Sequence, residues 1–140
     1  METARAYKLD PFVFCGLVEQ ESQWNPWSIR WEPGFFAKYV APQNLINPTE
    51  ATARAFSWGL CQVMGQVARE FGFKGYLSML CDPTLGLDMG CKVLRNKMAL
   101  HPSSVEAGLQ AYNGGAYAGY AKEVLARVPN YSSLPGLATI

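Results

Sequence analysis

Residues 10–26 read DPFVFCGLVEQESQWNP, and this stretch decides the fold. Asp10 is a favoured helix N-cap residue, and Pro11 suits the first helical turn because its fixed φ is already helical. The apolar residues that follow recur with a helical period, which predicts a helix that ends near Trp24. We therefore expect a helix here that carries two acidic residues close to its end.

Helix start and stop signals continue along the chain, whereas strand signals are scarce. Asn47-Pro48 and Asp82-Pro83 repeat the cap-and-proline pattern, and Ser103-x-x-Glu106 matches a capping box. Further helices are expected over about residues 48–56, 60–71, 83–100, 104–112 and 117–128. No repeat or low-complexity block interrupts them. Residues 1–140 are therefore expected to form a single all-α domain, with its core over about 11–128.

Length and charge narrow the class of protein. The chain has 140 residues, of which 49% are apolar and 13% aromatic, and this is enough for a packed core in one domain. There are 12 Lys and Arg against 11 Asp and Glu, and the net charge of +1 gives no basis for binding nucleic acid. We expect the protein to act as a monomer.

The cysteines do not form a metal site. Cys15, Cys61, Cys81 and Cys91 lack any C-x-x-C spacing and His101 is the only histidine, so we expect no metal and no cofactor. For the same reason a zinc peptidase, which needs an H-E-x-x-H motif, is excluded. The apolar neighbours of the cysteines predict buried free thiols, with a Cys81–Cys91 disulfide as the alternative in an oxidising compartment.

The N-terminal residues and the apolar runs indicate neither export nor membrane insertion. METARAYKLDPF lacks a basic segment followed by an apolar run, so no signal peptide is expected. The apolar runs elsewhere are far shorter than the roughly 20 residues that span a bilayer. We expect no stable insertion into a membrane.

Glu21 occupies an unusual position on the first predicted helix. On a helical wheel it projects into a stripe of apolar side chains, formed by Val13, Phe14, Leu17, Val18 and Trp24. Glu19 falls on the opposite, more polar side, beside Gly16 and Gln23. A carboxyl group among apolar side chains tends to hold its proton, which suits a general acid for cleavage of a glycosidic bond. The alternative is that Glu21, close to the helix end, simply reaches water.

Four segments resemble, in the right order, the signatures of the soluble lytic transglycosylase (SLT) domain of glycoside hydrolase family 23, which also contains the goose-type lysozymes. They are Glu21-Ser22-x-x-Asn25-Pro26, Gly59-Leu60-Cys61-Gln62, Asp82-Pro83 and Ala111-Tyr112-Asn113-Gly114-Gly115. The resemblance covers about residues 11–120. Two features depart from the family pattern. Phe56-Ser57-Trp58 stands where Gly-Ala usually precedes the second signature, and Cys61 replaces its methionine.

The resemblance implies a lysozyme-like α fold with a peptidoglycan groove, and a role for each matching residue. Glu21 would be the catalytic acid and then the base, and Ser22 would hold the helix end or the substrate. The substrate-binding residues would be Ser57, Gln62, Tyr112 and Asn113, with Gln62 on the helix opened by Gly59-Leu60. The alternatives are that Gln62 and Asn113 only satisfy backbone groups at helix ends, and that Tyr112 is a core ring.

A non-hydrolytic mechanism is the first hypothesis that the resemblance implies. Lytic transglycosylases use one Glu, assisted by the substrate's N-acetyl group. They cleave the β-1,4 bond between MurNAc and GlcNAc with formation of 1,6-anhydro-MurNAc. A hydrolytic, goose-type lysozyme is the second hypothesis. Glu32 is then the best second carboxylate, because Arg30-Trp31-Glu32-Pro33 follows the acid in a constrained turn. A structural Arg30–Glu32 ion pair is the alternative for this residue.

Residues 29–56 form an aromatic-rich insertion, longer than the segment that links these signatures in the family. The insertion carries Trp31, Phe35, Phe36 and Tyr39. We expect either a flap over one end of the groove, which adds sugar contacts, or aromatic side chains that pack at the surface.

A third hypothesis, from another class, is a non-catalytic glycan-binding or structural module of a phage particle, which needs no buried acid. For an enzyme, a start methionine without a signal peptide suggests a phage lysin. Such a protein is made in the cytoplasm and acts on the cell wall, in the periplasm or outside the cell. The expected partners are the glycan strands of peptidoglycan.

Overall fold

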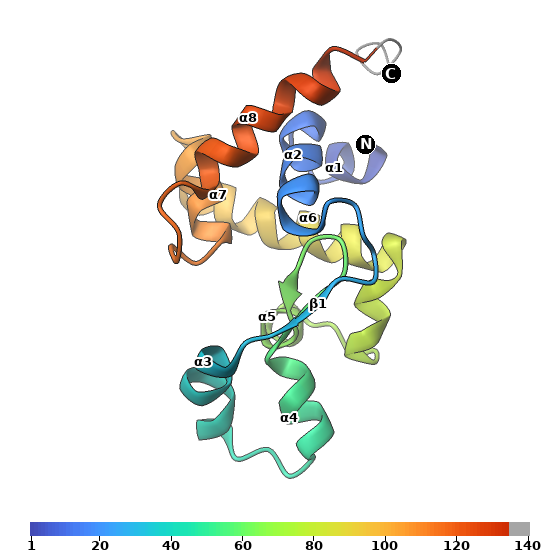
Figure 1. Cartoon of the computed structure of the whole chain (residues 1–140), viewed down its shortest axis with the longest axis vertical. Coiled ribbons are helices and arrows are strands. Elements are labelled where there is room, and N and C mark those ends of the chain that lie inside the picture. Colours follow the sequence, from blue (N-terminus) through green and yellow to red (C-terminus); the bar gives the residue numbers. More distant parts are fainter. Residues whose placement is uncertain (135–140) are drawn as a thin grey trace. The chain divides into compact units, whose positions relative to one another are not determined.

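The computed structural model describes residues 1–134, and the chain folds into two compact units (Figure 1). Unit 1 comprises Met1–Gln23 together with Cys91–Ile140, and unit 2 comprises Trp24–Gly90. Helix α6 (Pro83–Leu100) contributes to both, because the boundary falls within it. The described residues are mainly helical, which confirms the predicted class, but unit 2 also contains a small sheet that was not predicted.

Unit 1 is built from helices. Besides the C-terminal half of α6 it contains α1 (Glu2–Ala6), α2 (Pro11–Ser22), α7 (Val105–Tyr112) and α8 (Tyr120–Ser132). Figure 1 shows α2 beside α8. The core consists of apolar side chains from these helices, among them Phe14, Leu17, Leu94, Leu109 and Val124.

Side-chain caps determine where several helices begin. Asp10 accepts hydrogen bonds from the backbone N–H groups of Phe12 and Val13, as the prediction for α2 requires. Asp82 caps α6 in the same way. The predicted capping box at Ser103 is wrong by one residue, because the hydroxyl of the next residue, Ser104, accepts the backbone N–H of Ala107.

The last helix differs from the prediction at both ends. Helix α8 begins at Tyr120 rather than at Tyr117, and it continues through Pro129 to Ser132. Proline removes one helical hydrogen bond, so a helix was expected to stop before it. Here the carbonyl of Pro129 accepts hydrogen bonds from both the backbone N–H and the hydroxyl of Ser133, which stabilise the turn beyond the proline.

Helices α2 and α8 pack closely against each other at Gly16. A Cβ atom at this position would lie 2.7 Å from the backbone oxygen of Val124, so the contact requires a residue without a side chain. Leu17, Val18 and Val124 around it are fully buried. This packing allows side chains from the last turn of α2 to reach the first turn of α8.

Unit 2 combines a three-stranded antiparallel sheet with short helices. The strands β1 (Ile29–Trp31), β2 (Phe56–Trp58) and β3 (Val63–Met64) pair in this order. The helical segments are α3 (Pro33–Phe35), η1 (Phe36–Val40), η2 (Ala41–Gln43), α4 (Pro48–Arg54), α5 (Gly65–Glu70) and η3 (Leu77–Cys81). Buried side chains of the sheet and of these segments form the core of the unit, among them Val40, Ala55, Leu60, Val63 and Leu80.

The helix predicted over residues 60–71 is wrong in its first half. Strands β2 and β3 form a hairpin there, and α5 begins only at Gly65. The turn between the strands contains Gly59 with φ of 65° and Gln62 with φ of 48°. A Cβ atom at Gly59 would lie 2.3 Å from the carbonyl oxygen of Leu80, so this close approach also excludes a side chain. Tertiary packing therefore overrides the helical pattern of these residues.

All four cysteines are buried free thiols, as predicted. Cys81 and Cys91 are not bonded to each other, and a disulfide between them in an oxidising compartment stays a prediction. Burial raises the pKa of the Cys15 and Cys81 thiols, because the thiolate loses its solvation. These side chains therefore act as small apolar core residues.

The contact at Gly16 leads to a prediction about stability. Gly16→Ala should lower the free energy of unfolding by about 1–3 kcal/mol, because the new methyl group overlaps the backbone of α8. Urea denaturation followed by circular dichroism measures the change.

Gly34→Ala is the matched control for this substitution. A Cβ atom at Gly34 would meet nothing within 4 Å, so we expect a change of at most about 0.5 kcal/mol. Equal effects of the two substitutions would contradict the assigned contact.

Candidate functional site

Glu21 lies in the last turn of α2 and its side chain is half-buried. The hydroxyl of Tyr120, the first residue of α8, donates a hydrogen bond to Glu21 Oε1 at 2.5 Å. Tyr120 is only 1% exposed, so its ring is fixed in the core and its hydroxyl is presented to the carboxylate. The two residues are 99 positions apart in the sequence, and the packing of α2 on α8 brings them together.

Glu19, on the more polar side of the helical wheel, lies against α8. Gly16, on the same side of the helix, is packed against α8. The Glu19 carboxylate accepts a hydrogen bond from the hydroxyl of Tyr131 at 2.5 Å and lies 3.7 Å from Arg127 Nε. Both acidic residues of α2 therefore contact α8. Glu21 does so through a tyrosine hydroxyl, and Glu19 through a tyrosine hydroxyl and the guanidinium of Arg127.

A second set of polar contacts joins α2 to α8 beside Glu21. Gln20 Nε2 donates to Glu123 Oε2 at 2.8 Å, and the hydroxyl of Tyr117 donates to Glu123 Oε1. The Oε1 atom of Gln20 is buried and has no hydrogen-bond partner among residues 1–134. Leaving a buried acceptor unpaired is costly. The hydrogen bond from Nε2 to Glu123 holds the Gln20 side chain in this position despite that cost.

The charge state of this cluster follows from the same contacts. The hydrogen bond from Tyr117 lowers the pKa of Glu123, and the amide of Gln20 and the charge of Arg127 lower it further. The same contact raises the pKa of Tyr117. Glu123 is therefore ionised and Tyr117 is protonated over the physiological range.

The loop after α7 is held by two amide side chains. Asn113 Oδ1 accepts a hydrogen bond from the backbone N–H of Tyr117 at 3.2 Å, and Gln110 Nε2 donates to the carbonyl of Tyr117 at 2.5 Å. Gly114 and Gly115 between them adopt φ of 73° and 75°. Because Tyr117 also binds Glu123, a continuous chain of contacts links this loop to the helix that carries Glu21.

The other predicted residues of unit 1 lie at the ends of helices. The hydroxyl of Ser22 donates to the carbonyl of Val18 at 3.2 Å and is buried at the end of α2. Tyr112 is the half-buried last residue of α7. Contact of Ser22, Tyr112 and Asn113 with a substrate stays a prediction.

Ser57 and Gln62 belong to unit 2 and bind each other. The Ser57 hydroxyl donates to Gln62 Oε1 at 2.7 Å, and Gln62 Nε2 donates to the carbonyls of Ser28 and Gly59, each at 2.9 Å. Gln62 thus lies in the hairpin turn rather than on a helix. Both of its amide hydrogens are used within the unit, and Ser57 is only 2% exposed. Binding of substrate by these two residues also stays a prediction.

Glu32 forms the ion pair that the alternative hypothesis expected. Its Oε1 atom lies 2.5 Å from Nε of Arg30, and the arginine side chain is 73% exposed. Exposed pairs of this kind contribute little to stability. The pair holds Glu32 at the start of α3, where it is the residue before Pro33.

The aromatic side chains of the insertion pack on one another. Trp31 lies with its ring centroid 5.3 Å from that of Phe36 and 5.4 Å from that of Phe56, and Phe35 lies 4.8 Å from Tyr39. These contacts agree with the packing alternative for the insertion, whereas a flap over a groove stays a prediction.

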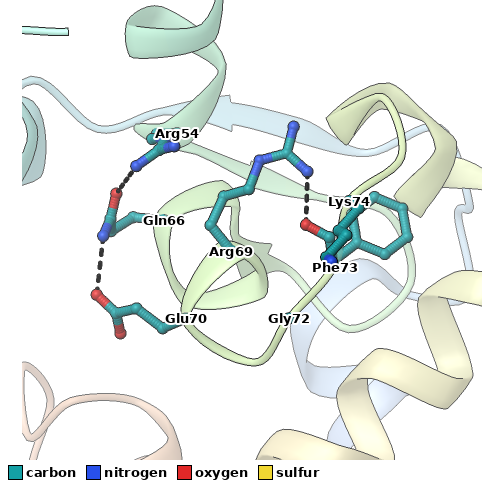
Figure 2. A pocket seen from close by; sticks show the side chains of 7 residues that line it. All are labelled: Arg54, Gln66, Arg69, Glu70, Gly72, Phe73 and Lys74. Atoms are coloured by element: carbon teal, nitrogen blue, oxygen red, sulfur yellow. Dashed lines mark hydrogen bonds between the residues drawn. The ribbon is translucent and has the colours of Figure 1, made fainter.

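A pocket of about 480 Å³ in unit 2 contains none of the predicted site residues, and Figure 2 shows the seven residues that line it. Arg54 donates to Gln66, Gln66 donates to Glu70, and Arg69 donates to the carbonyl of Phe73. The side chains of Arg54, Gln66, Glu70 and Arg69 are thus bonded within the lining itself.

Glu50 is the centre of this charged network. It accepts two hydrogen bonds from Arg69, at 2.7 and 2.9 Å, and one from Arg54 at 2.8 Å. Arg69 also binds the carbonyl of Gly75 and so connects the following loop to α5. The hydrogen bonds from Arg69 are the main reason why the pKa of Glu50 falls to about 2. We interpret the network as a structural clamp between α4, α5 and this loop.

No group of three or more His, Cys, Asp or Glu side chains within residues 1–134 is placed to hold a metal ion.

The comparison with known protein families identifies the class of protein. The family model described as the transglycosylase SLT domain matches residues 1–127. The chain therefore belongs to the transglycosylase SLT family. No curated protein and no solved structure matches it significantly.

Family membership assigns the substrate class. Members of the SLT family are peptidoglycan lytic transglycosylases, so the chain is of an enzyme family that acts on the cell wall. In the described part of the chain, no helix has the length and apolar character needed to cross a membrane.

Tyr120 and the Gln20–Glu123–Tyr117 cluster were not predicted from the sequence. Tyr120 carries no local signal, because its partner is distant in the chain and its role depends on how α8 packs on α2. Gln20 and Glu123 have ordinary helical surroundings in sequence, and only the structure brings them together.

The clamp around Glu50 leads to a prediction with a defined pH dependence. A lowered pKa in the folded state contributes stability above the ordinary value of 4.5, and this contribution disappears as the pH falls through about 2. Glu50→Gln should therefore lower the free energy of unfolding at neutral pH by about 2 kcal/mol, since solvent screens part of the interaction. Urea denaturation at neutral pH and near pH 3 measures the difference, which should shrink in acid.

Glu70→Gln provides the control, since Glu70 accepts its hydrogen bond from the neutral amide of Gln66 rather than from a guanidinium. We expect it to change the unfolding free energy by less than about 1 kcal/mol. A pH-independent loss in Glu50→Gln would contradict the ionic clamp.

Proposed function

We propose that the protein is a peptidoglycan lytic transglycosylase in which Glu21 acts first as the acid and then as the base. The observation that carries the proposal is the half-buried Glu21 carboxyl, positioned at the end of α2 by the Tyr120 hydroxyl. This residue also begins the first segment that resembles the family signature, Glu21-Ser22-x-x-Asn25-Pro26. The bond cleaved is the β-1,4 bond between MurNAc and GlcNAc.

Proton transfer through Glu21 accounts for both halves of the proposed reaction. The protonated carboxyl gives its proton to the glycosidic oxygen, and the GlcNAc leaves with a free hydroxyl at O4. The N-acetyl group of MurNAc assists departure at C1. The carboxylate then takes the proton of the C6 hydroxyl while this oxygen bonds to C1. The product is 1,6-anhydro-MurNAc, and the carboxyl ends protonated as it began, without consumption of water.

Tyr120 serves as a positioning residue in this proposal. A short hydrogen bond from a fully buried ring restricts the rotation of the Glu21 side chain. Catalysis depends on such orientation, because small displacements of a proton donor reduce the rate strongly. The Gln20–Glu123–Tyr117 cluster supports the same helix end and holds the loop of Asn113.

The remaining site residues divide into two kinds. Tyr112 and Asn113 would contact the sugars with a ring and an amide, as the family resemblance implies. Ser57 and Gln62 would act mainly by holding the hairpin of unit 2, because their polar atoms are bonded to each other and to the backbone.

A hydrolytic mechanism would need a second carboxylate that activates water. Glu32 is engaged with Arg30 through Oε1, which gives no support for a role as base. We therefore place the hydrolase second. A non-catalytic glycan-binding module is the third hypothesis, and cleavage of cell walls by the unmodified protein separates both enzymes from it.

Glu21→Gln should abolish cleavage of purified cell walls, because the amide cannot donate or accept the proton. The loss should be at least about 10³-fold, as expected for removal of an essential acid. Turbidity of a cell-wall suspension measures the activity, and circular dichroism checks the fold.

The same substitution at the other acidic residue of α2, Glu19→Gln, is the matched control. The amide oxygen that it introduces would still accept the hydrogen bond of Tyr131, so activity should stay within about threefold of the original. A Glu21→Gln variant that still cleaves would contradict the assignment. An unmodified protein that binds walls without cleaving them would favour the non-catalytic module.

Tyr120→Phe removes only the hydroxyl that binds Glu21. We expect kcat to fall on the order of 10²-fold with KM nearly unchanged, because the acid is less well oriented while the sugar contacts stay. Steady-state kinetics on soluble glycan strands measures both constants. An equal fall in Tyr131→Phe, whose hydroxyl binds Glu19 instead, would contradict a specific role for Tyr120.

A further inference from the structure

The small sheet of unit 2 has two different faces. Ser57 projects to one face, where it binds Gln62. Side chains alternate along a strand, so Phe56 and Trp58 on either side of it project to the other face. Their register partners on β1 are Trp31 and Ile29, which share that side because directly paired residues lie on the same face. We call these four side chains the aromatic face: Ile29, Trp31, Phe56 and Trp58.

The rings of the aromatic face form a connected and partly exposed row. The centroid of Phe56 lies 5.4 Å from Trp31 and 5.6 Å from Trp58. The indole N–H of Trp58 donates to the carbonyl of Ala53 at 3.0 Å, which fixes the orientation of its ring. Trp31 is 39% exposed and Ile29 52% exposed, so the rest of the unit covers this side of the sheet only in part.

A pocket of about 420 Å³ adjoins the aromatic face, within the range of small-molecule sites of roughly 300–1,000 Å³. It lies between the sheet and α4, and its lining consists of Pro48, Thr49, Thr52, Ala53, Phe56 and Trp58. None of these side chains carries a charge. Thr49 and Thr52 are exposed, so their hydroxyls are available at the rim.

This composition selects for a neutral ligand that has both apolar faces and hydroxyl groups. Aromatic rings cover the apolar faces of sugar rings, and threonine hydroxyls can donate to and accept from sugar hydroxyls. An ionic ligand would lose its hydration here without gaining a charged partner. An uncharged polysaccharide therefore fits the surface better than a nucleotide or an acidic peptide does.

We propose that the aromatic face and its pocket form a second glycan-binding surface, which takes the amino-sugar strand of the substrate. It shares no residue with the Glu21 site. The inference rests on the proposed function, since that function supplies a glycan polymer as the ligand. A strand bound at two places is retained more strongly than by either alone, which would keep the enzyme on an insoluble wall.

The test uses the full chain with Glu21→Gln, so that the sugar is bound and not cleaved. The probe is a soluble hexamer of β-1,4-linked N-acetylglucosamine, titrated while NMR spectra are recorded. The indole N–H signal of Trp58 and the amide signal of Thr52 should shift and saturate. Adding Thr52→Glu should weaken the affinity read at the Trp58 signal on the order of tenfold, because it puts a carboxylate at the rim of a neutral pocket.

Thr84→Glu is the matched control, because Thr84 is exposed near the start of α6 and outside the pocket. It should leave the affinity unchanged, and Thr49→Glu should repeat the effect of Thr52→Glu from a second position on the rim. Unshifted Trp58 and Thr52 signals, or equal affinity in Thr52→Glu and Thr84→Glu, would overturn the proposal. The proposal would also be overturned if the same signals shifted with protein concentration in the absence of sugar. That result would assign the surface to contact with a second copy of the chain.

These outcomes are independent of the proposed function, which is measured as wall cleavage by the protein with Glu21. Cleavage of cell walls without a shift of the Trp58 signal would contradict only the proposed second glycan-binding surface. A response at Trp58 without cleavage would support the surface and contradict the proposed enzyme.

Discussion

The hydrogen bond from Tyr120 to Glu21 is the contact on which the proposed chemistry of unit 1 depends. It can form only because α2 and α8 lie close together, and Gly16 makes this distance accessible. A larger residue there would separate the two helices. The sequence thus links a packing requirement in the middle of α2 to the orientation of a carboxyl group at its end.

Polar contacts in both units hold backbone segments that apolar packing alone would leave loose. In unit 1 the cluster around Glu123 connects the loop of Asn113 to α2. In unit 2 Gln62 holds the hairpin turn, while the clamp around Glu50 joins α4 to α5. Buried or half-buried polar groups have to be paired, so each such network favours one arrangement of its loop over others.

Sequence reasoning predicted most of the helices because their start signals act locally. Asp10, Asn47 and Asp82 each cap the helix expected from them. It failed at residues 60–64, where a helical pattern forms a turn and a strand because the hairpin pairs with a segment distant in the chain. The sheet was not predicted for a related reason. Its strands are only two or three residues long, which is too short for a period-2 pattern to be recognised in the sequence.

The candidate site shows the same division between local and distant information. Glu21 could be singled out from the pattern of α2 and from the resemblance to the family. Its partner Tyr120 could not, because no local feature relates residues so far apart. The wheel placed Glu19 on the side away from Glu21, but it could not show that α8 covers that side.

The central claim is that Glu21 cleaves a glycosidic bond without water. Digestion of purified peptidoglycan in water labelled with heavy oxygen, followed by mass spectrometry of the fragments, tests it most directly. The proposed mechanism predicts fragments that end in 1,6-anhydro-MurNAc and carry no label at the new end, and none of these fragments in Glu21→Gln. Reducing ends that contain one labelled oxygen would contradict the account and assign the enzyme to the hydrolases.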